Sequence, residues 1–173
     1  MRKVILGLAI SLDGYIEGPN GEYDWCFTDQ DYGLSEFFTQ VDSLFIGRKS
    51  YELMQSMGEN PSPGFPKMNE YIFSNTLTEV KPGAILVKGD AAQEVKSILQ
   101  QPGKDIWLFG GASLTAYFLE HNLVDQFWLS VHPILLGSGK QLFPHADHRR
   151  LLQLLESKTY DTGLISLKYE LKK

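Results

Sequence analysis

The sequence predicts an α/β fold with a mixed, mostly parallel central sheet, flanking helices and a C-terminal antiparallel hairpin. Three observations lead to this prediction. The run from Val4 to Ile10 is apolar without alternation, as in a strand that helices cover on both faces. Strand-like segments then alternate with segments of helical spacing up to about residue 121. Near the C-terminus, two strand-like segments flank Asp161-Thr162-Gly163, a run of residues typical of a hairpin turn.

The composition is that of one soluble globular domain. With 173 residues, of which 43% are hydrophobic and 21% charged, the chain is expected to form a single domain over 1–173. The net charge of -5 argues against a nucleic-acid partner. The single cysteine, Cys26, is interpreted as a packed side chain rather than a nucleophile. No apolar run approaches the length of a membrane span, so we expect a cytoplasmic protein without a membrane partner.

The first half of the chain alternates strands and helices around loops rich in glycine and proline. The long loop at 13–32 combines such turn residues with aromatic side chains, a composition typical of loops that cover sites. A second break contains Pro61, Pro63 and Pro66. The expected elements are strands at 4–10, 43–46, 70–74 and 84–87, and helices at 34–40 and 51–57.

The second half begins with a well-marked helix. Asp90 is a good N-cap, and the apolar stripe of Val95, Ile98 and Leu99 ends before Pro102 and Gly103. After it we expect a strand at 105–109, a helix at 113–121 and strands at 126–135, 151–159 and 164–171. The last third is expected to be antiparallel.

Two strand-to-helix turns carry the candidate chemistry. They are Gly47-Arg48-Lys49-Ser50 and Gly110-Gly111-Ala112-Ser113. A glycine at such a turn admits a ligand to the backbone, and the N–H groups at a helix start attract an anion. Arg48 and Lys49 oppose the helix dipole and so call for an anionic ligand, and Arg48 is expected to pair with phosphate rather than with an internal carboxylate. The alternative is that the glycines only make tight turns. Neither turn matches GxGxxG or GxxxxGK.

These turns belong to a longer series of motifs. The series comprises Ser11-Leu12-Asp13-Gly14-Tyr15-Ile16, Gly47-Arg48-Lys49-Ser50-Tyr51-Glu52, Phe109-Gly110-Gly111-Ala112-Ser113-Leu114, Leu123-Val124-Asp125 and the stretch from Val131 to Gly139, closed by Leu142-Phe143. In this order and spacing the chain resembles the dihydrofolate-reductase-like superfamily over its whole length. Within it, the chain is most similar to the C-terminal reductase domain of the bifunctional riboflavin biosynthesis deaminase-reductase.

The resemblance implies NADPH as the cofactor and assigns residues to it. It places Ala9 and Ile16 at the nicotinamide, and a cis peptide bond between the paired glycines. It sets Ser74, Asn75 and Lys88 around the 2′-phosphate. Along the pyrophosphate and adenosine phosphate it sets Gly47, Arg48, Lys49 and Ser50 on one side, and Gly110, Gly111, Ala112, Ser113 and Leu114 on the other.

The resemblance also implies an activity, namely hydride transfer to a C=N or C=O group of a small polar substrate, as in 5-amino-6-(5-phosphoribosylamino)uracil reductase. Asp13 would lie near the ribosyl part of such a substrate, and is compatible with a general acid, a substrate-hydroxyl acceptor or a turn residue before Gly14. One alternative is a dihydrofolate or other pterin reductase, although Asp29, Asp31 and Glu36 do not keep the spacing of the acidic residue in that family. Another alternative is a non-catalytic NADPH-binding protein.

Two further expectations concern metals and partners. His145 and His148 lie three residues apart without a convincing third ligand, so no metal is expected. The resemblance implies a homodimer, for which the apolar segment from Phe127 to Leu136 is the candidate interface element.

Overall fold

A computed structural model describes residues 1–58, 64–144 and 149–172 of the chain. The helices in these ranges are α1 (Leu34–Gln40), α2 (Arg48–Ser56), α3 (Ala91–Leu99) and α4 (Ala112–Glu120). The strands are β1 (Val4–Ser11), β2 (Tyr15–Glu17), β3 (Val41–Gly47), β4 (Asn69–Phe73), β5 (Ile85–Val87), β6 (Asp105–Gly110), β7 (Gln126–His132), β8 (Lys140–Gln141), β9 (Leu152–Thr159) and β10 (Ile165–Leu171).

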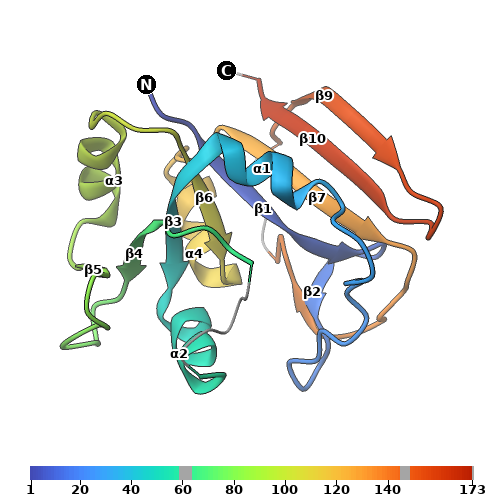
Figure 1. Cartoon of the computed structure of the whole chain (residues 1–173), viewed down its shortest axis with the longest axis horizontal. Coiled ribbons are helices and arrows are strands. Elements are labelled where there is room, and N and C mark those ends of the chain that lie inside the picture. Colours follow the sequence, from blue (N-terminus) through green and yellow to red (C-terminus); the bar gives the residue numbers. More distant parts are fainter. Residues whose placement is uncertain (59–63, 145–148, 173) are drawn as a thin grey trace.

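The main sheet has eight strands in the order β5-β4-β3-β6-β1-β7-β10-β9 (Figure 1). Strands β1, β3, β4, β5, β6 and β7 are parallel to their neighbours within this group. Strand β10 runs antiparallel to both β7 and β9. The predicted fold class is thereby confirmed. The expectation for the last third is wrong in one respect, because β7 pairs with β1 in parallel, and the antiparallel part of the main sheet consists of the pairings of β10 with β7 and with β9.

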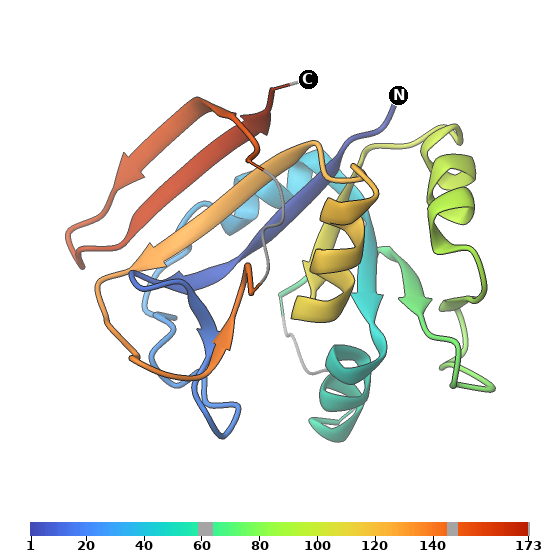
Figure 2. The same cartoon turned by 180° about the vertical axis from the view of Figure 1, so that it is seen from behind.

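Helices cover both faces of the parallel part of the sheet (Figures 1 and 2). On one face Phe37 of α1 packs with Trp107 and Trp128, and Tyr51 of α2 packs with Ile46. On the other face the buried side chains of α3 and α4 pack against β1, β3 and β6. Every side chain from Val4 to Leu6 is therefore buried, which explains why β1 is apolar without alternation.

Three local features differ from the sequence-based expectation. Strand β7 ends at His132 rather than at residue 135, because Pro133 has no N–H to continue the ladder. Helix α2 begins at Arg48, three residues earlier than expected. The short strands β2 and β8 form a separate antiparallel pair that the sequence does not indicate.

Strand β7 contains most of the segment 127–136 expected at an interface, and its place there stays a prediction. Both of its edges are occupied, one by β1 and the other by β10. Backbone pairing with another molecule is therefore not open to this strand. Separately, none of the helices in the described ranges has the length and apolarity needed to cross a bilayer.

Candidate functional site

The carboxyl ends of the parallel strands gather the predicted site residues at one edge of the sheet. Strand β1 ends at Ser11, β3 at Gly47 and β6 at Gly110. Strand β4 ends next to Ser74, and β5 next to Lys88. In open α/β sheets, ligands bind in the crevice outside these ends. The fold therefore brings together turns that lie more than sixty residues apart in sequence.

The two glycine turns lie side by side. Ile46 pairs with Gly110 across β3 and β6. A Cβ at Gly47 would lie 3.4 Å from the carbonyl oxygen of Gly110, and a Cβ at Gly111 would lie 3.2 Å from Ser50 Oγ. Side chains at these glycines would thus fill the space between the turns.

The chain path at Gly110 and Gly111 corrects one expectation. The described residues contain no cis peptide bond, so the cis bond implied for this pair is absent. Both glycines instead adopt positive φ, of 101° and 53°. With a ψ of 152°, Gly111 occupies a region that only glycine enters at low cost.

Helices α2 and α4 both begin at these turns without a side-chain cap. Their N-cap residues, Gly47 and Gly111, make no side-chain hydrogen bond, and neither first turn holds an acidic residue. Helix α3 differs, because Asp90 Oδ1 accepts a bond of 3.1 Å from Gln93 N. An uncapped N-terminus retains N–H donors and a partial positive charge. The edge therefore presents two such N-termini, with Ala112, Ser113 and Leu114 in the first turn of α4.

Arg48 and Lys49 form the first turn of α2, and Arg48 is paired within that helix. Arg48 Nη1 donates to both carboxylate oxygens of Glu52, each at 3.0 Å, contrary to the expectation that it has no internal partner. The two residues lie one helical turn apart, which explains the pairing. Their side chains are 39% and 47% exposed, so solvent screens the pair and Arg48 can change partners at small cost. Lys49 is exposed beside it.

A second group of predicted residues meets at the ends of β4 and β5. Ser74 Oγ accepts from the amides of Thr76 and Leu77, so it stabilises a turn. Asn75 Oδ1 accepts from Gly89 N at 2.9 Å. Lys88, next to that glycine, is exposed. The amide of Asn75 thus holds the end of β5, and with it the Lys88 backbone, against the end of β4.

The remaining predicted residues lie at the end of β1. Ala9 is in β1 opposite Ser130 of β7. Ile16, in β2, packs against the main hydrophobic core. Both side chains are partly buried.

Asp13 connects this end to a distant loop. Its Oδ1 accepts from Ser11 Oγ at 2.6 Å and from Leu136 N at 3.1 Å, and its Oδ2 accepts from Gly137 N at 2.8 Å. The hydroxyl of Ser11, together with these amides, holds the pKa of Asp13 below its usual value. A carboxylate that stays ionised is a poor proton donor, which disfavours the general-acid role. Three of about four acceptor positions are used, and the last can take a substrate hydroxyl.

His132 was assigned no role in the sequence analysis. Its side chain is buried; Nδ1 lies 2.9 Å from Ser130 O, and Nε2 accepts from Phe27 N at 3.1 Å. The ring of Trp25 meets the imidazole edge-on at 5.3 Å. Burial lowers the pKa of His132. The neutral ring therefore anchors the aromatic loop at 13–32 to the end of β7. The composition of that loop was the only feature of the sequence that pointed to a role in the site.

The acidic residues considered for folate recognition have other contacts. Asp31 accepts from Gly33 N and Ser35 N at the start of α1. Asp29 accepts from the hydroxyl of Tyr32 at 2.6 Å. Glu36 is exposed, and the position of α1 that is buried belongs to a phenylalanine. None of the three carboxylates lies buried against the sheet, so the structure gives no support to a pterin site.

Other reactive residues offer no chemistry here. Burial raises the pKa of Cys26 to about 11, with Asp24 adding to the shift, so its thiol stays protonated. His145 and His148 lie outside the described residues. Within the described ranges, no three His, Cys, Asp or Glu side chains are grouped as a metal site.

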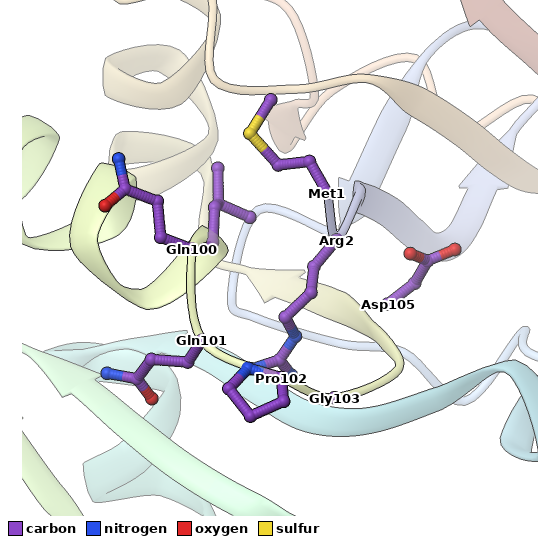
Figure 3. A pocket seen from close by; sticks show the side chains of 8 residues that line it. Met1, Arg2, Gln100, Gln101, Pro102, Gly103 and Asp105 are labelled. Atoms are coloured by element: carbon purple, nitrogen blue, oxygen red, sulfur yellow. The ribbon is translucent and has the colours of Figure 1, made fainter.

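A hollow of about 460 Å³ lies at the opposite end of the sheet (Figure 3). The guanidinium of Arg2, one of its lining residues, pairs with Asp42 and donates to Ser43 Oγ at 2.6 Å. Because the charge of Arg2 is committed to these partners, the hollow has little to offer an anion. It is lined by Met1, Arg2, Leu99, Gln100, Gln101, Pro102, Gly103 and Asp105.

Comparison with known proteins agrees with the fold and the motifs. The chain is 41% identical to the uncharacterised protein YyaP of Bacillus subtilis (strain 168), over 97% of this chain and 94% of the relative. YwjB of the same organism is 31% identical, over 92% of each chain. A solved structure from Shewanella sp. PV-4, named for riboflavin biosynthesis, superposes with a TM-score of 0.85 at 27% identity, covering 99% of both chains.

More distant structures share the fold. The deaminase and 5-amino-6-(5-phosphoribosylamino)uracil reductase of Thermotoga maritima matches with a TM-score of 0.76 at 14% identity, over 99% of this chain and 57% of that one. Enterococcus faecalis dihydrofolate reductase, in complex with NADP(H), matches with a TM-score of 0.72 at 13% identity, over 99% and 97%. The family model described as the RibD C-terminal domain matches residues 2–166. The chain therefore belongs to the RibD C-terminal domain family.

Proposed function

We propose that this protein is an NADPH-dependent reductase that transfers a hydride to a C=N or C=O group of a small polar substrate, in the manner of a pyrimidine reductase. One observation carries the proposal. Two uncapped helix N-termini, those of α2 and α4, begin at adjoining glycine turns on the carboxyl edge of the sheet. Two anion-attracting helix ends in contact suit a pyrophosphate, which carries two neighbouring negative groups. Membership of the RibD C-terminal domain family, together with the fold shared with a 5-amino-6-(5-phosphoribosylamino)uracil reductase, supports the same activity.

The residues present fit the dinucleotide. Gly47 and Gly111 leave free the space that side chains would fill, and the first-turn amides of both helices supply donors. Arg48 and Lys49 add the positive charge that the phosphates need in a chain of net charge -5. Lys88, next to the Gly89 amide that Asn75 accepts from, would meet a further phosphate, which is the reason for preferring NADPH to NADH.

The chain would provide position and shielding, while NADPH supplies the hydride. Ala9 and Ile16, both partly buried near the end of β1, would lie beside the nicotinamide ring. The loop that His132 anchors through Phe27 covers the same end of the sheet and limits access of water. Asp13 remains ionised and has one acceptor position left, so it would orient a substrate hydroxyl rather than donate a proton.

The test compares two variants of one ion pair. Arg48→Ala should weaken NADPH binding by about 10-fold to 100-fold, and NADH binding less, because a charged hydrogen bond is worth about 1.5 to 3 kcal/mol. Glu52→Ala removes the present partner of Arg48 and should leave binding equal or tighter. Titration by fluorescence transfer to NADPH measures both. Equal affinities for all three proteins would remove Arg48 from the site.

Turnover separates the enzyme from a non-catalytic NADPH-binding protein. The oxidation of NADPH is followed with ribosylaminopyrimidines, pterins and simple carbonyl compounds as substrates. Reduction of a pyrimidine that needs a higher NADPH concentration in Arg48→Ala and not in Glu52→Ala supports the proposal. Tight NADPH binding with no turnover of any compound would favour the non-catalytic alternative.

A further inference from the structure

The face of the sheet that carries α1 continues along β7 to the edge proposed for the cofactor. Strands β1 and β7 run side by side toward that edge (Figure 1). Trp128 of β7 packs in one cluster with Phe37 of α1. Because side chains alternate along a strand, Ser130 and His132 lie on the same face as Trp128. The register sets Ser130 opposite Ala9, which we place beside the nicotinamide. Ser130 therefore adjoins the place where the hydride would be transferred.

Ser130 is the open position between two buried rings. Trp128 and His132, two residues away on either side, are 6% and 3% exposed, whereas Ser130 is partly exposed. The loop at 13–32 reaches the imidazole, because the rings of Trp25 and Phe27 lie 5.3 Å and 5.0 Å from it. A flat substrate beside Ser130 would thus have a ring on each side of it along β7.

The hydroxyl of Ser130 has no partner, whereas the polar side chains around it are engaged. The indole N–H of Trp128 donates to a serine of β10 at 2.8 Å, and both nitrogens of His132 have partners. On β1, Ser11 Oγ donates to Asp13 and accepts from a backbone amide. Within residues 1–58, 64–144 and 149–172, the Ser130 hydroxyl makes no hydrogen bond. Since the fully buried polar side-chain atoms of these residues all have partners, this hydroxyl is open to solvent and to a ligand.

The neighbouring histidine argues against a nucleophilic role for Ser130. A serine nucleophile needs a base that accepts its proton. Nδ1 of His132 lies 2.9 Å from the carbonyl oxygen of Ser130, so Nδ1 carries the proton of the neutral ring. The lone pair of Nε2 accepts from Phe27 N. Neither nitrogen is left to accept from the Ser130 hydroxyl, which is therefore suited to donate a hydrogen bond rather than to attack.

We propose that the Ser130 hydroxyl donates a hydrogen bond to the nitrogen or oxygen atom of the C=N or C=O group that receives the hydride. This inference rests on the proposed function. As the hydride adds to the carbon, the π electron pair moves to that nitrogen or oxygen, which takes a proton from solvent water. A donor aimed at the atom where negative charge develops stabilises the transition state. Asp13 cannot supply this bond, because its carboxylate stays ionised and only accepts.

The test compares matched variants of Ser130. NADPH oxidation is followed with 5-amino-6-(5-phosphoribosylamino)uracil, dihydrofolate and a simple aldehyde as probes. For the probe that the wild type reduces, Ser130→Ala should lower kcat/KM by about 10-fold to 100-fold, because a hydrogen bond to a developing charge is lost. Ser130→Thr keeps the hydroxyl and should retain most of the rate. Ser130→Val has the shape of threonine without the hydroxyl, and should lose as much as Ser130→Ala.

Two controls separate this role from a structural one. NADPH titration and melting curves of Ser130→Ala should match those of the wild type, because the lost hydroxyl has no partner in the protein. Ser166→Ala removes the hydroxyl that accepts from Trp128, at the position of β10 opposite Ser130. It should lower Tm, because the indole N–H loses its acceptor, and leave kcat/KM near the wild-type value.

The outcomes distinguish this inference from the reductase function. Equal kcat/KM for the wild type and Ser130→Ala, or for Ser130→Thr and Ser130→Val, would overturn the role of Ser130 while the reductase stands. A loss of NADPH affinity as large as the loss of kcat/KM would place the hydroxyl on the cofactor, and would also overturn it. A wild type that reduces none of the probes would count against the reductase, and the inference about Ser130 would fall with it.

Discussion

Replacing Gly111 by alanine tests the turn at the start of α4. The φ of 53° and ψ of 152° at this residue lie in a region that costs an L-residue about 1 to 3 kcal/mol. The new Cβ would also lie 3.2 Å from Ser50 Oγ, a contact that a change of the serine rotamer can relieve. For a chain of this size, each kcal/mol lowers Tm by about 2 to 4 °C. We therefore expect Gly111→Ala to lower Tm by about 2 to 12 °C.

The assay separates torsional strain from crowding and from ligand binding. Thermal unfolding is followed by circular dichroism for Gly111→Ala, for Ser50→Ala and for the double variant. Because φ strain persists without the serine, the double variant should recover only a small part of the lost Tm. NADPH binding should fall in every protein that carries the alanine at position 111. A wild-type Tm would refute the torsional reasoning, and a lowered Tm with unchanged NADPH affinity would show that the turn is only structural.

Two further predictions concern other parts of the same edge. Gly139→Ala should destabilise the fold more than Gly111→Ala, since its Cβ would lie 2.1 Å from the carbonyl oxygen of Glu17, a backbone atom that cannot turn aside; urea denaturation of both variants gives the comparison, and equal losses would contradict it. The lowered pKa of His132 predicts that stability falls as pH drops below about 6.5, because the unfolded chain binds the proton more strongly than the fold does. Melting curves of wild type and His132→Gln between pH 5 and pH 8 should converge toward low pH, and parallel curves would count against this role.

The alternation of strands and helices could be predicted because a strand buried on both faces has a continuous run of apolar residues. Val4 to Leu6 are apolar because helices cover both faces of β1. The start of α3 was equally clear, since Asp90 accepts from the first-turn amide as a capping residue should. Helix α2 was expected three residues too late. No capping side chain precedes its start at Arg48, and without a capping residue the first residue of a helix cannot be located from the sequence.

The site was predictable in part for the same reason. Adjoining strands bring the two glycine turns together, so knowledge of the fold sufficed to place Gly47 beside Gly110. The roles of Asp13 and His132 could not be seen, because their partners are backbone amides of distant loops, at Leu136 and Phe27. Backbone amides are present in every sequence and leave no residue-specific signal. The pair of β2 and β8 was not predicted either, because strands of three and two residues are too short to show an alternation of apolar and polar residues.

The contrast between the capped and uncapped helices leads to a last prediction, at Gly47. Its φ of -80° and ψ of 158° suit any N-cap residue, so glycine is not required there by torsion. Serine at this position would cap α2 and stabilise the ligand-free protein by a few tenths of a kcal/mol. The same hydroxyl would occupy an amide that we assign to phosphate, and its Cβ would fill space beside the Gly110 carbonyl. Gly47→Ser should therefore melt at or slightly above the wild-type temperature and yet bind NADPH more weakly. Unchanged NADPH affinity in a stable Gly47→Ser protein would mean that the open N-terminus of α2 does not serve the cofactor.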